Sequence, residues 1–354
     1  MKKKIRVVQF GVSHEHANGK LETLRFLSDD FEIAGVVDDR AHTTPRWPLR
    51  RPDSLVEGLP LLTEEQVWAD KTIDAAFVEV TNCELVETAR RVLAHGLPMH
   101  LDKPGGESYE PFASLRKEAK ARGLPLQMGY MFRANPAIRW LIDAVRKGWF
   151  GDIFEIEASM DHGYGDDDYR RYLGSFRAGI LYNLCCHLVD FVVSMLGEPV
   201  SASQAICTAP GSPADSRDNC AATLQYASGA LVHLRSCGRM VGQIRRRLRV
   251  CGTLGWAELC PIERFDGQPL LLEVQFRESA GGIPAGAVQT LDFGSQGRVS
   301  NVDRYAAQLR EFARQVRGEE KEPDDLCEHD LAVQRTLLKM CGLDDGFGVR
   351  SSAG

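Results

Sequence analysis

Short apolar runs alternate with helical patterns along the first 130 residues. Apolar runs at residues 5–10, 31–37, 73–80, 99–101 and 125–128 predict buried strands, and the periodic apolar positions between them predict helices. Strands and helices that alternate with short connections indicate a parallel, doubly wound Rossmann sheet. We expect this dinucleotide-binding domain to span residues 1–129.

A different pattern follows residue 130. Residues 153–160 alternate between apolar and polar positions, as a half-buried strand does. Further strand-like runs lie at residues 203–208, 221–226, 230–235, 247–252, 257–259, 270–277 and 288–291. So many strands in series indicate a large, mostly antiparallel open sheet, and residues 301–316 and 331–340 have helical patterns. We therefore predict an α/β chain whose second, α+β domain spans residues 130–354.

The first forty residues have the order strand, turn, helix, strand, acid, which is typical of a dinucleotide-binding unit. In such a unit Gly11 makes the tight turn, the following helix N-terminus faces a pyrophosphate, and Asp38 accepts hydrogen bonds from a ribose. The glycine signature itself is altered, since Ser13 and His16 stand where G-x-G-x-x-G has its second and third glycines. Taken alone, the segment is a weak signal for a dinucleotide and is more typical of an ordinary βαβ unit.

Two observations concern the polar residues around this turn. His14 and His16 could suggest a metal pair, but two histidines without a nearby cysteine or carboxylate pattern are too few ligands, so we expect no metal and a turn-lining role. In doubly wound sheets, ligands bind beyond the carboxyl ends of the strands. The polar or glycine residues at those ends are Gly11, Asp38, Thr81, Asn82, Asp102, Lys103 and Tyr130.

One helix, predicted from the run at residues 178–190, carries polar side chains inside an otherwise apolar stretch. Asn183, His187 and Asp190 are spaced i, i+4 and i+7, which places them along one stripe. An imidazole between an amide and a carboxylate can be held in one tautomer and exchange a proton near neutral pH. The alternative is a buried histidine whose neighbours satisfy its hydrogen bonds.

Three segments resemble the glucose–fructose oxidoreductase / inositol dehydrogenase / MocA (Gfo/Idh/MocA) family of nicotinamide-dependent sugar and polyol oxidoreductases. They are residues 99–104 (MHLDKP), which resemble the family's Glu-Lys-Pro strand end, residues 130–136 (YMFRANP), and the helix of residues 179–190. The similarity runs from Ile5 to about Leu338. It implies hydride transfer between a nicotinamide and a secondary alcohol or ketone of a sugar, polyol or related carbohydrate.

The resemblance also implies roles for single residues. Lys103 would bind the reacting oxygen, and His187 would exchange the hydroxyl proton. Asn183 stands at the position of the family's helix aspartate, and it cannot carry charge or accept a proton at neutral pH. We therefore expect His187 to act as the base, with Asn183 orienting substrate or bonding to His187 and Asp190 tuning it.

The expected cofactor and substrate contacts come from the strand ends, the first βαβ unit and the polar segment 161–171, together with this resemblance. The residues assigned to the cofactor are Gly11, Ser13, His14, His16, Asp38, Thr81, Asn82 and Asp102. We expect NAD, because Asp38 and Asp39 would repel the 2′-phosphate of NADP, although Arg40 leaves NADP open. The residues assigned to a carbohydrate or polyol are Tyr130, His162, Tyr164, Arg170 and Asp190. Three of these lie in the polar segment 161–171, which closes over a polyol or else is a solvated loop.

Composition narrows the class further. The net charge of −6 argues against a nucleic-acid partner. No apolar run reaches transmembrane length and no secretory leader is evident, so we expect no membrane partner. The ten cysteines form no C-x-x-C motif, which favours free thiols in a reducing compartment and hence a cytoplasmic location. In the resembled family the outer face of the second sheet builds a homodimer or homotetramer.

Three functions stay open at this point. The first is an NAD(P)-dependent dehydrogenase or reductase acting on CH–OH groups. The second is a catalytically impaired relative that acts as a binding or regulatory protein, which the residues Ser13, His16 and Asn183 favour. The third is an enzyme that keeps and recycles bound NAD for elimination or epimerisation.

Overall fold

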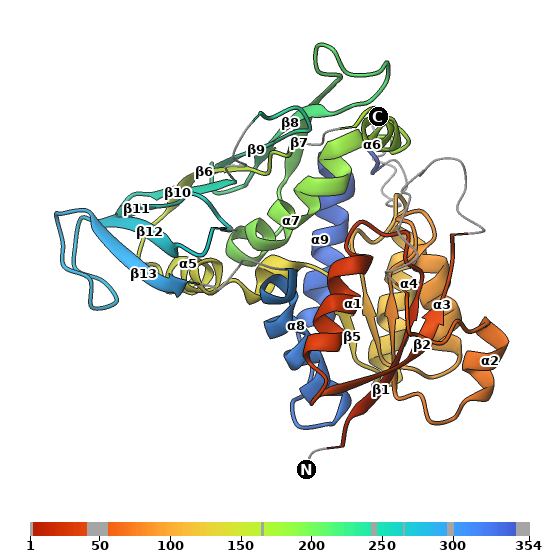
Figure 1. Ribbon diagram of the computed structural model, residues 1–354. Helices are drawn as coiled ribbons and strands as arrows, with labels where there is room; N and C mark the ends of the chain where they lie inside the picture. The colour runs from red at the N-terminus through yellow and green to blue at the C-terminus, as the bar shows by residue number, and fades with distance from the viewer. Residues whose placement is uncertain are drawn as a thin grey trace, which may run out of the picture.

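The structure is a computed structural model that describes residues 3–40, 56–163, 166–241, 246–264, 266–295 and 301–344. Tyr164, one of the expected substrate contacts, lies outside these residues. Two sheets dominate, a parallel one and a much wider one, and long helices lie where they meet (Figure 1). The predicted fold class is confirmed.

The first sheet has five parallel strands in the order β2-β1-β3-β4-β5. Its strands are β1 (Ile5–Phe10), β2 (Phe31–Val37), β3 (Ala75–Val78), β4 (Met99–Leu101) and β5 (Leu126–Met128). The helices between them are α1 (Ala17–Phe26), α2 (Glu64–Ala69), α3 (Leu85–Ala94) and α4 (Tyr109–Ala121). The chain order reverses between β1 and β3, and in such sheets ligands bind outside the carboxyl ends of strands at this reversal.

Gly11 makes the turn at the carboxyl end of β1 possible. Its φ of +86° lies in the left-handed region, which favours glycine. A Cβ atom at this position would lie 2.7 Å from the Cα atom of Val80. The positive φ and the close approach of the chain after β3 both require glycine at position 11, in agreement with the predicted tight turn.

The second sheet has eight strands in the order β13-β12-β11-β10-β6-β9-β8-β7. They are β6 (Ile153–Ser159), β7 (Ser201–Cys207), β8 (Asn219–Gln225), β9 (Leu231–Cys237), β10 (Arg247–Gly252), β11 (Gly255–Leu259), β12 (Pro269–Phe276) and β13 (Gln289–Ser295). Every pair is antiparallel except β6 with β9. The mostly antiparallel sheet predicted from the alternating runs is therefore confirmed.

The remaining helical elements join the two sheets. They are a 3₁₀ turn η2 (Met131–Ala134), α5 (Pro136–Arg146), α6 (Asp167–Leu173), α7 (Gly179–Leu196), α8 (Asn301–Val316) and α9 (Leu326–Met340). Helix α8 returns to the first sheet and packs beside α1, and α9 packs against both α4 and α7. Helix α7 lies along the eight-stranded sheet, and α9 therefore links it to α4 of the first domain (Figure 1).

Helix α7 corrects one expectation from the sequence. It is long and apolar enough by length and composition to cross a membrane, although no such run was expected. In the structure 89% of this stretch is buried inside the protein, and a core helix of a soluble protein passes the same test. The ten cysteines are all free thiols.

A buried ionic network fixes α7 to α9. The Asp190 carboxylate lies 2.6 Å from Arg133 Nη2 and 3.1 Å from His329 Nε2. Arg133 Nη2 also lies 2.7 Å from the Asp330 carboxylate of α9. Burial raises the pKa of Asp190, but Arg133 and His329 outweigh burial and lower the pKa below its ordinary value of 3.8. Asp190 is thus paired with Arg133 and His329 of the protein itself.

We predict that Asp190→Asn lowers the free energy of unfolding by about 3 kcal/mol, because it removes one partner of a buried ion pair. Because the pKa of Asp190 is lowered in the folded state, its contribution is present above pH 3.8 and is lost as the pH falls through the lowered value. Urea unfolding at pH 7 and pH 3 measures both effects.

The matched control is Glu311→Gln, which removes an exposed pair with Arg139 and should change stability by less than about 1 kcal/mol. Equal effects of the two substitutions at pH 7 would contradict the structural role of Asp190.

Candidate active site

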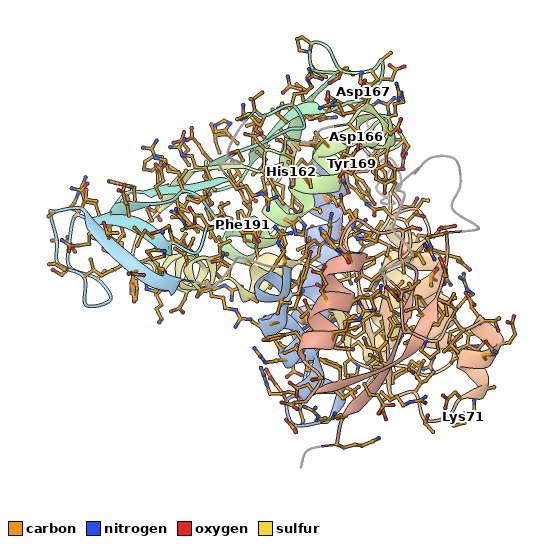
Figure 2. The ribbon with its side chains drawn as sticks, viewed as in Figure 1. Lys71, His162, Asp166, Asp167, Tyr169 and Phe191 are labelled. Carbon is orange, nitrogen blue, oxygen red and sulfur yellow. The ribbon has the colours of Figure 1, made fainter. Side chains whose placement is uncertain are left out.

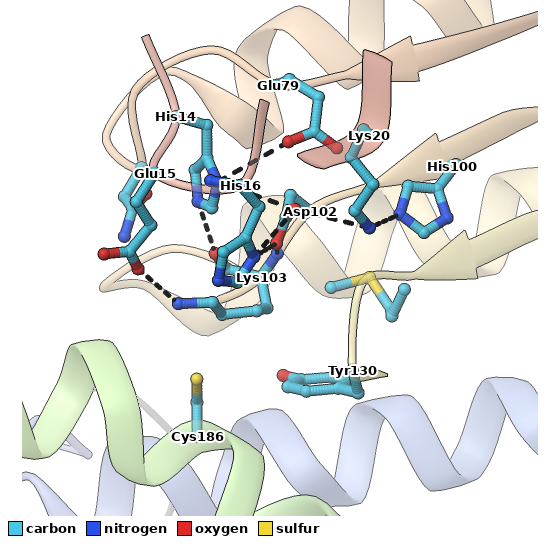
Figure 3. Close-up of polar contacts among 12 residues, drawn as sticks. His14, Glu15, His16, Lys20, Glu79, His100, Asp102, Lys103, Tyr130 and Cys186 are labelled. Atoms are coloured by element: carbon cyan, nitrogen blue, oxygen red, sulfur yellow. Dashed lines mark hydrogen bonds and ion pairs between the residues drawn. The ribbon is translucent and has the colours of Figure 1, made fainter. Parts of the chain in front are cut away.

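Lys103 is the buried cation at the centre of the site. It follows β4 directly, and its Nζ atom donates hydrogen bonds to Glu15 Oε1 at 2.8 Å and to the carbonyl oxygen of Asn183 at 3.1 Å. The Tyr169 hydroxyl donates to the other oxygen of Glu15. Burial opposes the charge of Lys103, but Glu15, Cys186 and Asp102 together outweigh burial and raise the pKa of Lys103 above its ordinary value of 10.5. Lys103 therefore stays protonated, and Figure 3 shows its contact with Glu15.

Asn183 connects three elements through its amide group. Its Oδ1 atom accepts a hydrogen bond from Asn82 Nδ2 at 2.8 Å, and its Nδ2 atom donates to the Tyr169 hydroxyl at 3.0 Å. These bonds join the loop after β3 to α7 and α6. The sequence predicts that Asn183 orients substrate or bonds to His187. In the structure its side-chain amide bonds to Asn82 and Tyr169.

His187 lies one turn further along α7 and is 1% exposed. Its ring centroid lies 5.6 Å from that of Phe132, 5.9 Å from that of His16 and 6.1 Å from that of Tyr130. Neither ring nitrogen has a hydrogen-bond partner among the residues that the structure describes. A buried polar group without a partner requires an explanation, and a site that awaits a ligand supplies one.

Charges around His187 keep its ring neutral. Burial lowers the pKa of His187 well below its ordinary value of 6.5, and the nearby Lys103 ammonium and His16 lower it further. The imidazole is therefore unprotonated at neutral pH, and one of its nitrogens can accept a proton. A neutral base and a permanent cation thus lie close together at the carboxyl edge of the parallel sheet.

The loop after β1 carries a second group of buried polar side chains (Figure 3). His16 Nδ1 lies 3.1 Å from Asp102 Oδ1, and His14 Nδ1 lies 3.6 Å from Asp102 Oδ2. His14 is 1% exposed and Asp102 is fully buried. Both residues were expected to contact a cofactor, and in this structure their side chains contact each other beneath the loop.

A cavity of about 460 Å³ lies over Gly11 and the carboxyl ends of β1 and β2. Five carboxylates line it, namely Asp38, Asp39, Glu64, Glu84 and Glu87. Arg40 forms a bidentate pair with Asp38, and the Asp39 carboxylate accepts hydrogen bonds from the Ser13 hydroxyl at 2.9 Å and the amide of Val12 at 2.8 Å. Thr81 was also expected to contact a cofactor. Its hydroxyl donates a hydrogen bond to the Glu84 carboxylate.

The expected substrate residues are only partly brought together. Tyr130 is buried beside His187, and its ring packs against the Arg133 guanidinium at 4.9 Å from the centroid. His162 contacts Arg246. Figure 2 shows His162 and Tyr169 near α7 and α6. Lys71 lies at the opposite end of the molecule. Arg170 pairs with Asp167 at 2.7 Å.

Two residues of the site were not expected from the sequence. Glu15 lies between His14 and His16 in the altered glycine loop, and Tyr169 lies on α6. The sequence did offer a signal for Glu15, because an acidic residue is unusual in a loop that normally faces a pyrophosphate. The negative charge of Glu15 in such a loop needs a cation beside it, and Lys103 supplies this cation. Tyr169 carried no such signal, because one tyrosine in a polar segment is common on a surface.

A comparison with known families identifies the middle of the chain. Residues 138–258 match the model of the GFO/IDH/MocA C-terminal domain, and this range includes the helix of residues 179–190, one of the three segments that resemble the family. No curated protein sequence matches this chain.

Solved structures share the whole fold. GenD2 from gentamicin A biosynthesis, solved in complex with NAD, is 17% identical with a TM-score of 0.74, over 97% of this chain and 95% of GenD2. UDP-N-acetylglucosamine 3-dehydrogenase GnnA from Acidithiobacillus ferrooxidans is 18% identical with a TM-score of 0.72, over 97% and 98% of the two chains. KijD10, a 3-ketoreductase from Actinomadura kijaniata solved with TDP-benzene and NADP, is 17% identical with a TM-score of 0.71, over 96% of each chain. These likenesses establish the two-sheet architecture.

Proposed function

Since residues 138–258 belong to the GFO/IDH/MocA C-terminal domain family, we propose that this protein is an NAD(P)-dependent oxidoreductase acting on a secondary alcohol or ketone of a carbohydrate. One observation carries the proposal. A protonated lysine and a neutral histidine without a hydrogen-bond partner, Lys103 and His187, lie near each other at the carboxyl edge of a parallel sheet.

The two residues have complementary roles. The Lys103 ammonium donates a hydrogen bond to the reacting oxygen and stabilises the negative charge that develops there. A nitrogen of His187 takes the hydroxyl proton during oxidation and returns it during reduction. The main-chain carbonyl oxygen of Asn183 accepts a hydrogen bond from Lys103, so we assign Asn183 a positioning role.

The residues over Gly11 fit a dinucleotide. The absence of a side chain at Gly11 leaves the loop close to β3, and the adjacent cavity has room for an adenosine, with the Asp38 carboxylate at its wall for the ribose hydroxyls. Gly11, Ser13 and Asp38 would hold this part, and the loop that contains His14 and His16 would face the pyrophosphate. When bound, the nicotinamide supplies the acceptor or donor of the hydride.

We predict that NADH binds at least about tenfold more tightly than NADPH. Five carboxylates line the cavity, and among the described residues Arg40 and Arg91 already pair with two of them, Asp38 and Glu64. Like charges brought together at a binding site cost several kcal/mol, and about 1.4 kcal/mol corresponds to tenfold. Isothermal titration calorimetry with both nucleotides measures the preference.

Asp38→Asn should reduce the ratio of the NADPH to the NADH dissociation constant. The control is Asp143→Asn, which alters an exposed carboxylate paired with Lys147 and should leave this ratio unchanged. Equal affinities for the two nucleotides in the wild-type protein would refute the preference for NAD.

Entry of a carbohydrate requires movement of the site. Lys103 and Asn183 are fully buried, and the Glu15–Tyr169 pair covers the lysine. The segment around α6 is therefore proposed to open for substrate and to close over it, with His162, Arg170 and Tyr130 as candidate contacts.

The outer face of the eight-stranded sheet is the proposed surface for a homodimer or homotetramer.

The placement of Asn183 favours a second candidate function, a binding protein with impaired turnover. An amide occupies the position where the resembled family has a carboxylate, and here it is bonded on both sides. Asn183→Asp separates the two functions. A large gain in turnover would support impairment, and a loss would show that asparagine suits the natural substrate.

A further inference from the structure

Four potential metal ligands converge beneath the loop that follows β1. His14 and His16 come from this loop, Glu79 directly follows β3, and Asp102 directly follows β4. His14 Nδ1 lies 3.6 Å from Glu79 Oε2 and 3.6 Å from Asp102 Oδ2, and His16 Nδ1 lies 3.1 Å from Asp102 Oδ1. Ligands that surround Zn²⁺ at ~2.0–2.1 Å in a tetrahedron are roughly 3.4 Å from one another. Ligand atoms of His14, His16 and Asp102 all lie within 4.8 Å of one another, and Glu79 lies beside this group next to His14.

Glu79 provides an independent sign that a ligand belongs here. Its side chain is fully buried, and neither carboxylate oxygen accepts a hydrogen bond from an N–H or O–H donor among the described residues, while the Asp102 carboxyl group lies beside it. The carboxylate is directed at His14 Nδ1 (Figure 3). A buried carboxylate without hydrogen bonds is unfavourable, and a bound cation removes this penalty.

The second nitrogen of His14 has the partner that metal-binding histidines usually have. His14 Nε2 lies 3.2 Å from the carbonyl oxygen of Lys103. Donation from Nε2 to this carbonyl fixes the tautomer that leaves Nδ1 as the metal-binding atom. The amide of His16, which lies 3.1 Å from Nδ1, must give up this contact when a metal binds.

Lys20 marks the limit of the site on its other side. Its Nζ atom contacts His100 Nε2 and lies 3.7 Å from Asp102 Oδ2. The ammonium therefore occupies the space between His100 and Asp102. Among the ion pairs described for His14, His16, Glu79 and Asp102, Lys20 is the one basic side chain other than histidine, and it contacts Asp102 from the side of His100.

We propose that His14, His16, Glu79 and Asp102 bind one divalent transition-metal ion of the Zn²⁺ type. Nitrogen and carboxylate ligands without thiolates suit Zn²⁺ and its neighbours in the first transition row. The ion ties the loop after β1 to the ends of β3 and β4. It thereby orders a loop that has lost two of the glycines usual at this position. This proposal is independent of the proposed oxidoreductase function.

The test uses the untagged, full-length protein. Metal content is measured by mass spectrometry after purification, and the chelator-treated protein is then titrated with ZnCl₂ by calorimetry. We expect one ion per chain, a higher melting temperature on binding, and, with Co²⁺, the visible absorption of a tetrahedral site. No nucleotide or alcohol is present, so failure here and failure of the proposed function are distinguishable.

Two variants and one control make the test specific. Glu79→Gln keeps the shape of the side chain, and His16→Phe keeps an aromatic ring beside Tyr305. Each should weaken Zn²⁺ binding by more than about 100-fold, since even loss of an outer partner costs ~10–100-fold. His95→Asn removes an exposed histidine from the end of α3 and should bind like the wild type. Circular dichroism verifies the fold of each variant.

Absence of one-to-one binding in the wild-type protein would overturn the proposal and leave a proton shared between Glu79 and Asp102 as the occupant of the site. Unchanged Zn²⁺ affinity in both folded variants would overturn it equally, because binding would then occur elsewhere.

Discussion

Replacing His187 with glutamine is expected to lower kcat for alcohol oxidation by about 10²–10⁴-fold, the contribution of a positioned general base. The expectation rests on two observations, the burial of the ring and the lack of hydrogen-bond partners for both nitrogens among the described residues. Glutamine can occupy the space but cannot take a proton. Steady-state kinetics with saturating cofactor measures the loss.

The pH profile adds a readout that a structural role would not affect. Because the pKa of His187 is lowered well below 6.5, its ring stays neutral as the pH falls through that value. The wild-type kcat/KM for oxidation should therefore show no loss near pH 6.5. The control is His233→Gln, which alters a histidine on β9 that contacts Thr223 and should leave kinetics unchanged. Full turnover in folded His187→Gln protein would contradict the assignment of the base.

Lys103→Met is expected to lower kcat/KM by about 10²–10³-fold, as loss of one preorganised electrostatic donor does. It also leaves the Glu15 carboxylate without the cation 2.8 Å away. The single variant should therefore lose up to about 3–5 kcal/mol of stability, which is the effect of breaking a buried ion pair.

The double variant Lys103→Met/Glu15→Gln separates these two effects. Removing both charges should restore most of the stability, because no buried charge is then left without a partner. Activity should stay low, since the donor to the reacting oxygen is still missing. If the double variant regained wild-type kcat/KM together with stability, Lys103 would be a structural residue and not a catalytic one.

Local sequence patterns account for most of the fold. Buried strands of a parallel sheet are mostly apolar, and residues 75–78 are wholly apolar while residues 5–10 are apolar except for Arg6 and Gln9. Alternation likewise predicted the strands of the second sheet, since β8 and β9 bury every second residue. The stripe of Asn183 and His187 on α7 follows from the helical period alone.

The contacts between distant segments could not be predicted in the same way. The i+7 spacing placed Asp190 near His187, but the structure pairs Asp190 with Arg133 and His329, which lie 57 and 139 residues away. Likewise, His14 and His16 were too few ligands for a metal when only their own loop was considered. The carboxylates that complete the group, Glu79 and Asp102, come from two other strand ends, which only the folded sheet brings together.

The central claim is that a carbinol hydrogen leaves the substrate as a hydride in the site of Lys103 and His187. The most direct measurement incubates the protein with NAD⁺ and a panel of polyols, sugars and nucleotide sugars, each carrying deuterium at its carbinol carbons. Mass spectrometry then analyses the reduced nucleotide. We predict deuterium in the NADH formed by the wild-type protein and at least about 10²-fold less in His187→Gln. Wild-type protein that binds NAD⁺ but transfers no deuterium from any member of the panel would contradict the claim.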